Sequence, residues 1–156
     1  KSSVILLKLT RSFMEKDSWW TAPAESEDGH LIMVTGNKDV AKFRSNPRFC
    51  IRIEVSWNYT GDASGMPDTA TSELMEQVQE ALQTEFRKDP VAILTGIFTG
   101  DGKREWVFYS VSTHIFGKKL NQALEPFPLL PITVYCENDP GWEGYDEMTQ
   151  AEIRFD

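Results

Sequence analysis

The sequence is poor in the residues that build metal and redox sites. It contains two cysteines, Cys50 and Cys136, and two histidines, His30 and His114. The cysteines lie far apart without C-x-x-C spacing, and neither histidine has a second histidine at ligand spacing. We therefore predict no metal and no cofactor. We expect both thiols to be buried or half-buried, and both histidines to have surface or capping roles.

Cations are scarce as well. The chain has 16 Lys and Arg residues against 24 Asp and Glu, which gives a formal net charge of -8. This charge repels a polyanion at long range, so nucleic acid is not an expected partner. The one dense cationic stretch, from Lys38 to Arg52, is interrupted by Val40, Phe43 and Phe49. We interpret it as the solvated face around a short helix.

Long apolar runs are also missing. The run Val4–Leu9 is apolar, but it is broken by Lys8 and followed by Arg11. It is too short and too charged to span a membrane, and it lacks the cleavage region of a signal peptide. Together with the low cysteine content, these features favour a cytoplasmic protein without a membrane partner.

No catalytic constellation is recognisable. Gly96–Arg104 is rich in glycine before Lys103, but Ile97 stands where a phosphate-binding loop requires glycine. A hairpin explains the stretch better. Two runs rich in β-branched and aromatic residues meet at Gly100–Gly102, where Asp-Gly tolerates the positive φ of a tight turn. This pattern therefore predicts two antiparallel strands in Val91–Ser110.

Hydrophobic periodicity predicts the other core elements. Phe49–Tyr59 alternates apolar and polar residues, which is typical of a strand with one buried face. Asp68–Lys88 repeats apolar residues at every fourth position and predicts an amphipathic helix. A second helix begins at a cap formed by Ser112 or Thr113 and is ended by prolines. Pro131–Glu137 is the last predicted strand.

The segment before this core predicts smaller elements. Lys1–Met14 is either a short amphipathic helix or a strand. Asp17–Pro23, which contains two adjacent tryptophans, and His30–Thr35 predict an N-terminal hairpin. Asn37 is expected to cap a single helical segment that runs through Phe43.

The segment after the core predicts one more short helix. Asp139 is suited to its N-cap and Pro140 to its first turn. Trp142 and Tyr145 lie three residues apart on this helix, and we favour packing on the core over a binding role for both. The last residues are expected to fray.

From Phe49 onward the order is strand, helix, strand, strand, helix, strand. This is the split βαβ pattern (βαββαβ) of ferredoxin-like α+β domains, with two helices on one face of an antiparallel sheet. We predict a single domain, 1–156, in which the first and last core strands are neighbours. Alternation places Cys50 on the polar face and Cys136 on the apolar face, so no disulfide is expected. The divisions are the core 48–137, the N-terminal β-hairpin extension in 1–47 and the C-terminal segment 138–156.

The second face of this sheet matters for function, because two helices cover only one. Arg52, Glu54 and Ser56 should point to it, together with Thr95 and Thr99 or their alternates. The N-terminal hairpin either folds partly over this face or leaves it as a platform for a partner. The candidate binding surface is this face with the aromatic C-terminal segment, and its residues are Arg52, Glu54, Arg104, Tyr109, Trp142 and Tyr145.

Three motifs resemble a known family: Gly65–Asp68 (GMPD), Asp101–Tyr109 (DGKREWVFY) and Asp139–Tyr145 (DPGWEGY). The chain resembles, from about Trp19 to Met148, a bacterial family catalogued as domain of unknown function 695. That family has a distant likeness to the regulator of ribonuclease E activity B. The resemblance implies a ferredoxin-like core and a protein partner, and it brings no activity, cofactor or catalytic residue.

Three functional hypotheses follow. The first is a non-catalytic protein-binding or regulatory domain, and its basis is the negative charge, the aromatic content and the absent catalytic set. The second is a small-molecule binder or small enzyme with a pocket between the N-terminal hairpin and the sheet, using Arg52, Glu54 and Tyr109. A face filled by Trp19 and Trp20 would argue against that pocket. The third is a homodimer formed through an exposed sheet edge.

Overall fold

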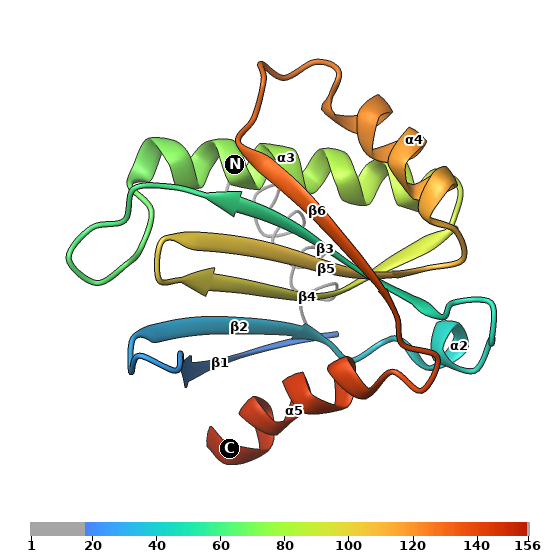
Figure 1. Ribbon diagram of the computed structural model, residues 1–156, viewed down its shortest axis with the longest axis horizontal. Coiled ribbons are helices and arrows are strands. Elements are labelled where there is room, and N and C mark those ends of the chain that lie inside the picture. The colour runs from blue at the N-terminus through green and yellow to red at the C-terminus, as the bar shows by residue number, and fades with distance from the viewer. Residues whose placement is uncertain (1–17, 156) are drawn as a thin grey trace, which may run out of the picture.

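An antiparallel sheet of six strands organises the chain, and the computed structural model describes residues 18–155. The strands are β1 (Trp19–Glu25), β2 (Leu31–Asn37), β3 (Ile51–Asn58), β4 (Ala92–Gly100), β5 (Lys103–Ser110) and β6 (Ile132–Asn138). The helices are α2 (Ala41–Arg44), α3 (Thr69–Lys88), α4 (Thr113–Leu124) and α5 (Glu143–Phe155). The fold is α+β, and the strand order is β1-β2-β4-β5-β3-β6 (Figure 1). The element expected at Lys1–Met14 lies outside the described residues.

The hairpin predicted in the middle of the chain is confirmed as β4 and β5. Its two-residue turn consists of Asp101 and Gly102, whose φ angles of 56° and 76° are those that an Asp-Gly turn adopts. Gly100, just before the turn, allows β2 to come close, because a Cβ there would lie 2.3 Å from the carbonyl oxygen of Leu31. Glycine at this position therefore allows another strand to pair with this edge of β4.

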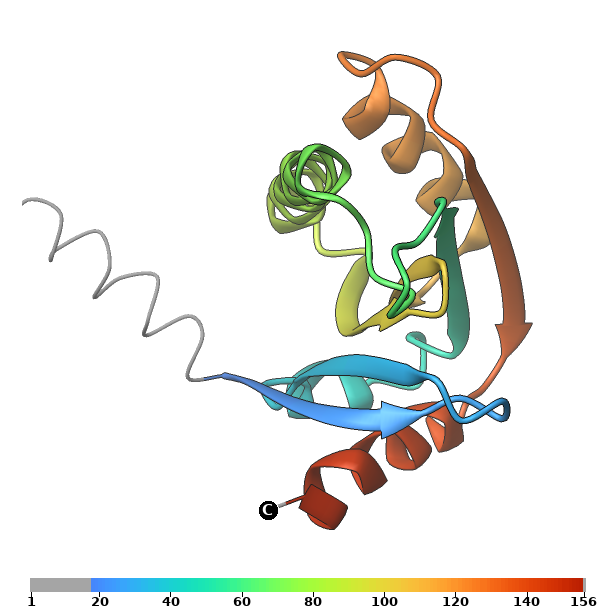
Figure 2. The same cartoon turned by 90° about the vertical axis from the view of Figure 1, so that its left-hand side faces the viewer.

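The N-terminal hairpin takes that edge. β1 pairs with β2, and β2 pairs with β4, so the predicted hairpin is present but continues the sheet and does not fold over it. Its apolar side chains Trp20, Ala22 and Val34 pack around Met148 of α5. In Figure 2, α5 lies under β1 and β2, on the opposite side from α3 and α4.

The main core lies between the sheet and the helices α3 and α4 (Figure 1). Phe86, Phe108 and Phe116 meet there with ring centroids 5.0–5.2 Å apart. Both helices begin at the predicted caps. Asp68 accepts a hydrogen bond from Thr71 N at 2.7 Å, and the Ser112 hydroxyl accepts one from Ile115 N at 3.2 Å. None of the described helices is long and apolar enough to cross a membrane.

The predicted cap at Asn37 was wrong. α2 begins after Val40 without a side-chain cap, and Asn37 is the last residue of β2. Its buried amide donates to the carbonyl oxygen of Leu94 at 3.0 Å and accepts from Asp39 N at 2.9 Å. The first bond joins β2 to β4, and the two together use the polar groups that a helix cap would need.

The neighbouring positions of β3 and β6 are confirmed, but Cys136 is not buried. Cys136 lies opposite Ile53, whereas Cys50 lies beyond the end of the pairing, opposite Asp139. Both cysteines are free, Cys50 is half-buried, and Cys136 is exposed. Cys136 is exposed because β6 is the last strand of the sheet, where the core no longer covers even the apolar face.

Candidate functional site

Helix α5 divides the second face of the sheet into two halves. It packs against β1, β2 and β4, and it leaves β3 and β6 largely uncovered (Figure 2). On β5, which lies between β4 and β3, Val107 and Tyr109 are buried and Glu105 is partly exposed. Residues paired across antiparallel strands share a face, so the uncovered half carries three rows of side chains. The rows are Tyr109–Arg52–Glu137, Val107–Glu54–Tyr135 and Glu105–Ser56–Thr133. We call these nine residues the open face.

Arg52 holds the charged centre of the open face. Its Nη1 donates a hydrogen bond to the Glu54 carboxylate and lies 3.6 Å from a carboxylate oxygen of Glu137. Burial lowers the pKa of the Arg52 guanidinium, but the hydrogen bond and the negative charge of Glu54 outweigh burial, and the pKa is raised. Arg52 therefore stays charged and holds two carboxylates beside it.

A second charged group lies at the far end of the same face. The Ser56 hydroxyl donates to Glu105 at 3.1 Å, and Lys103 Nζ lies 3.7 Å from the same carboxylate oxygen. Opposite charges thus follow one another along β3, at Arg52 and Glu54, and along β5, at Lys103 and Glu105. Such an arrangement offers directional contacts to a charged surface.

Asp139 joins this face to the start of α5. Its two carboxylate oxygens accept the amides of Glu143 and Gly144, each at 2.9 Å, and one of them also accepts the Tyr109 hydroxyl at 2.6 Å. Tyr109 in turn accepts the amide of Tyr145 at 3.2 Å. Asp139 and Tyr109 together satisfy the free amides of the first turn, so the helix start is not available to an outside anion.

These contacts change two pKa values. Burial, followed by the hydrogen bond to Asp139, raises the pKa of the Tyr109 hydroxyl. Burial also works against ionisation of Asp139, but the hydrogen bonds from Tyr109, Gly144 and Glu143 outweigh it and lower the pKa of Asp139. The pair is therefore a neutral phenol bonded to an ionised carboxylate at pH 7.

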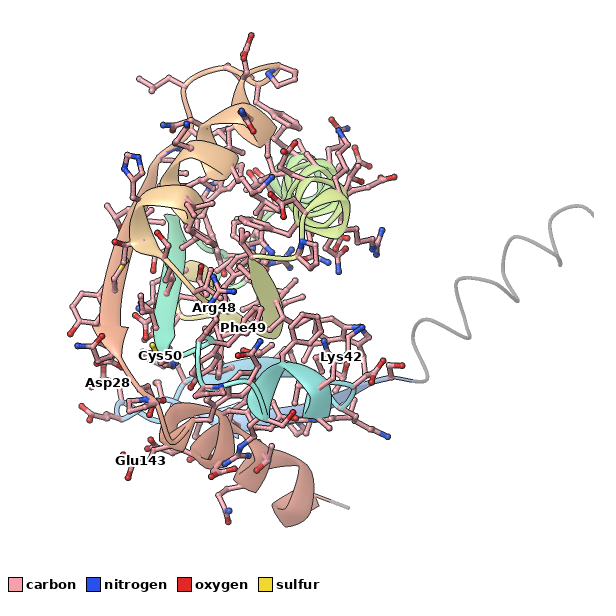
Figure 3. The ribbon with its side chains drawn as sticks, turned by 90° about the vertical axis from the view of Figure 1, so that its right-hand side faces the viewer. Asp28, Lys42, Arg48, Phe49, Cys50 and Glu143 are labelled. Carbon is pink, nitrogen blue, oxygen red and sulfur yellow. The ribbon has the colours of Figure 1, made fainter. Side chains whose placement is uncertain are left out.

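The Trp142 side chain packs against the Tyr109 ring of this pair. It is 1% exposed, it stacks on Tyr109 with ring centroids 4.0 Å apart, and its indole N–H donates to the carbonyl oxygen of Phe49 at 2.7 Å. Figure 3 labels Phe49 and Cys50 at the entry to β3 and Glu143 at the start of α5, on the same side of the molecule. Trp142 thus fastens α5 to the beginning of β3.

Gly144 lets Arg52 lie across the first turn of α5. A Cβ on Gly144 would be 2.6 Å from Arg52 Nε and 2.9 Å from its Cδ. Arg52 Nε is buried there and has no hydrogen-bond partner among the described residues. Any side chain at this position would push Arg52 away from the two carboxylates that it holds.

Tyr145 and Arg44 fix the next turn. The Tyr145 hydroxyl donates to the carbonyl oxygen of Asn37 at 2.6 Å. Arg44 of α2 donates to both carboxylate oxygens of Asp146, at 2.7 and 2.8 Å, and its guanidinium lies over the Tyr145 ring. The hydrogen bond and negative charge of Asp146 oppose the effect of burial and raise the pKa of Arg44. These contacts hold α5 against α2 and β2.

Arg104 lies on the other face of the sheet. It lies two residues before Trp106 on β5, so both side chains point to the face that α3 and α4 cover. Its Nε donates to the Thr99 hydroxyl at 2.8 Å, and Nη1 lies 3.7 Å from Glu76. Thr99 is therefore also on the helix side, because the bulge after Leu94 shifts the alternation of β4. Burial lowers the pKa of Arg104 despite the charge of Glu76.

Two hollows lie beside the N-terminal hairpin. The larger, of about 1060 Å³, is an open groove between α3 and the strands β1, β2 and β4, with Trp19, Ile97 and Arg104 in its lining. The smaller, of about 500 Å³, lies where the ends of β1, β2, β4 and β5 meet. Its floor is apolar, with Ile32 and Phe98, and its polar lining residues are Glu25, Ser26, Asn58, Asp101, Lys103 and Glu105.

Three ligand-type side chains meet next to the smaller hollow. Asp28, His30 and Asp101 bring one ligand atom each within 4.8 Å of one another, and no other such group of three His, Cys, Asp or Glu occurs in residues 18–155. All three are exposed, and His30 Nδ1 is hydrogen-bonded to Asp101 Oδ1 at 2.7 Å. The hydrogen bond between His30, beside the β1–β2 turn, and Asp101, in the β4–β5 turn, accounts for the arrangement.

A model described as "Family of unknown function (DUF695)" matches residues 18–148. The chain belongs to the DUF695 family. No curated protein and no solved structure gives a significant match.

The three motifs of this DUF695 chain have structural roles. Gly65 of GMPD lies on the turn of DGKREWVFY: its carbonyl oxygen accepts Gly102 N at 3.0 Å and the Tyr59 hydroxyl at 2.7 Å. A Cβ on Gly65 would lie 2.9 Å from Asp101 N, and its φ of 85° also favours glycine. The third motif, DPGWEGY, supplies the Asp139, Trp142 and Gly144 contacts described above.

The structure brings together part of the predicted binding surface. Arg52 and Glu54 lie on the open face. Tyr109 is paired with Arg52 on the same face, but its side chain is buried. Trp142 and Tyr145 pack behind that row, as in the alternative that we favoured for them. Arg104 lies on the opposite side of the sheet, apart from the rest.

Sequence reasoning missed three residues that shape this region of the DUF695 chain. Tyr135 and Glu137 lie on β6 directly beside Glu54 and Arg52. Extending the predicted pairing of the first and last core strands residue by residue would have found both. Asp139 was predicted only as a cap, because its bond to Tyr109 joins residues that are 30 positions apart.

Proposed function

We propose that this DUF695 chain is a non-catalytic, cytoplasmic, bacterial protein-binding or regulatory domain with a ferredoxin-like core. The strand order β4-β5-β3-β6, with α3 and α4 over the same face, supports the core assignment. It agrees with the resemblance to the regulator of ribonuclease E activity B. The partner is another protein, which binds the open face.

The observation that carries this proposal is the charge-paired surface of β3 and β6, together with Glu105 of β5, which α5 does not cover. Of the nine open-face residues, Glu105 alone lines either of the two hollows described above. A surface of alternating charges selects a partner with the complementary pattern, because like charges placed opposite each other are unfavourable. Tyr135 is 58% exposed in the middle row, and tyrosine is enriched at the energetic centres of protein interfaces.

Neutralising two open-face carboxylates tests the proposal. We expect Glu54→Gln with Glu105→Gln to reduce capture of a specific protein by the tagged full chain about tenfold, because two partner contacts lose their charge. Capture from cells that express the protein naturally would be quantified by mass spectrometry.

The matched control removes two exposed carboxylates elsewhere, with Glu73→Gln and Glu125→Gln. It should capture the same protein as the unmodified chain. If the unmodified chain retains no protein reproducibly, or if both double variants retain it equally, the open face is not the binding site. Thermal unfolding of both variants checks that each is folded.

The smaller hollow supports a second candidate, a small-molecule binder or small enzyme. Its volume of about 500 Å³ lies within the range of ligand pockets, and the N-terminal hairpin contributes part of its lining, including Glu25 and Ile32. Its polar groups are Asp101, Lys103 and Glu105, and not the Arg52, Glu54 and Tyr109 expected from sequence.

Thermal shift with a metabolite set tests this candidate. A compound present at about 100 times its Kd should stabilise the chain by about 2.7 kcal/mol, which raises the melting temperature by several degrees. Lys103→Met should remove the shift, whereas Lys118→Met, an exposed lysine of α4, should leave it. A set without any stabilising compound, or a shift that survives Lys103→Met, counts against a ligand in this pocket.

A further inference from the structure

Strand β6 ends the sheet with an unpaired edge. It pairs with β3 along its whole length, and no other described strand pairs with it. In Figure 2, β6 forms the right-hand border of the molecule, with no segment drawn beyond it. The outer edge of β6 is therefore free to accept another strand.

The phase of the β3–β6 pairing shows which backbone groups face outward. Asp139 N donates to Cys50 O at 2.8 Å, which extends the ladder by one hydrogen-bonded pair. Because such pairs alternate with non-bonded ones, Glu137 and Tyr135 also turn their backbone groups to β3. Val134 and Cys136 consequently turn their N–H and C=O groups outward. The same alternation requires the odd-numbered residues of β3 to bond to β5 on its other side. The hydrogen bond from Tyr59 N to Gly102 O agrees with this.

Nothing in the sequence of β6 protects this edge. Ile132–Asn138 contains no lysine, arginine or proline, and Glu137 is its single charged residue. Native edge strands are normally shielded by such residues, by bulges or by a covering segment. The opposite edge, β1, contains Pro23 and has α5 packed against it.

Exposed apolar side chains collect near the same edge. Five large hydrophobic side chains are exposed in the described residues, and three of them lie within 129–135: Leu129 at 102%, Val134 at 46% and Tyr135 at 58%. Val134 and Tyr135 point to opposite faces of β6, so an added strand would cover apolar surface on both faces.

A second copy of this chain fits the edge without charge conflict. Antiparallel pairing of β6 with itself is two-fold symmetric. With the axis at Tyr135, Val134 of one protomer lies opposite Cys136 of its partner, and both residues have the outward backbone groups that a hydrogen-bonded pair needs. Glu137 then lies opposite Thr133 of the other protomer, so no carboxylate meets a carboxylate.

We propose that two copies of this chain associate through β6, paired antiparallel about a two-fold axis at Tyr135, and join their sheets into one. The interface is the outer edge of β6, and the open-face residues of β3 and β5 lie outside it. Tyr135 side chains of the two protomers then lie side by side on one face, where an aromatic cross-strand pair is favourable.

The molecular mass in solution tests the pairing. Light scattering of the full chain over a concentration series should give twice the 17.8 kDa of the chain at the highest concentrations. Val134→Pro removes an outward N–H but no bond to β3, and Val134→Lys places a charge at the edge without changing the backbone. Each should weaken dimerisation at least tenfold. Leu31→Lys, which replaces an exposed hydrophobic residue of β2, should remain dimeric.

Native Cys136 reports the register. The two Cys136 residues are diagonal neighbours in this pairing, roughly 7–8 Å apart, so a short bismaleimide should link them. Cys136→Ser should abolish the link and Cys50→Ser should preserve it. A monomeric mass throughout, a dimer that withstands both Val134 variants, or an edge occupied by a different protein overturns the proposal. The Glu54 and Glu105 variant should still dimerise, which separates this outcome from the test of the open face.

Discussion

Replacing Trp142 by alanine will lower the free energy of unfolding by about 3–5 kcal/mol. The side chain is almost fully buried, stacks on Tyr109 and donates to the carbonyl oxygen of Phe49. Its removal leaves a cavity between α5 and the entry to β3, together with an unpaired carbonyl group. Chemical denaturation of the full chain at pH 7 measures the loss.

Two further variants identify the cause. Trp142 has a φ of 57°, a conformation that glycine adopts without strain. Trp142→Gly should therefore be about 1 kcal/mol more stable than Trp142→Ala, although glycine fills less of the cavity. Ile115→Ala is the control, because it removes an exposed apolar side chain of α4 and should cost far less. A loss below about 1 kcal/mol for Trp142→Ala would show that α5 is held in another way.

Replacing Asp139 by asparagine should lower the free energy of unfolding by about 2–3 kcal/mol at pH 7. The carboxylate accepts the amides of Glu143 and Gly144 and the hydroxyl of Tyr109. An asparagine side chain has one carbonyl oxygen and an NH₂ group, so one of these donors loses its acceptor. The start of α5 should loosen as a result.

The effect should depend on pH in a defined direction. The folded chain lowers the pKa of Asp139 below its unfolded value of about 3.9. Its contribution is therefore complete above that value and is lost as the pH falls through the folded pKa. The difference in stability between the unmodified chain and Asp139→Asn should be constant from about pH 8 to 5 and should narrow below about pH 4.

Asp146 provides the control for this profile, because its pKa is also lowered, through its hydrogen bonds with Arg44. Asp146 is exposed, so Asp146→Asn should cost no more than about 1 kcal/mol. If the Asp139→Asn difference stays unchanged down to about pH 2, the ionised carboxylate is not what stabilises this junction.

Local patterns predicted much of the fold. The Asp101–Gly102 turn, the alternation of β3 and the four-residue spacing of α3 each depend on neighbouring residues and hold in the structure. The caps at Asp68 and Ser112 were found for the same reason. The β3 row of the open face followed as well, since Arg52, Glu54 and Ser56 alternate with buried residues on one strand.

Contacts between distant residues could not be predicted in this way. Alternation shows that one side of a strand is apolar, but not which element covers it. Trp20 and Val34 turned out to face α5, and Trp142 turned out to be buried under Tyr109. A single bulge at Thr95 moved Thr99 to the helix side. Such shifts depend on the pairing partner and leave no periodic signal.

The sequence by itself determined the elements of this DUF695 chain, their order and the polar residues that β3 contributes to the open face, because these depend on the chemistry of residues close together in the chain. The tertiary structure alone decided that the N-terminal hairpin extends the sheet, that α5 covers half of the second face and that β6 keeps an exposed edge. These outcomes arise from competition among distant segments for the same strand edges and the same apolar surface, which no local pattern records.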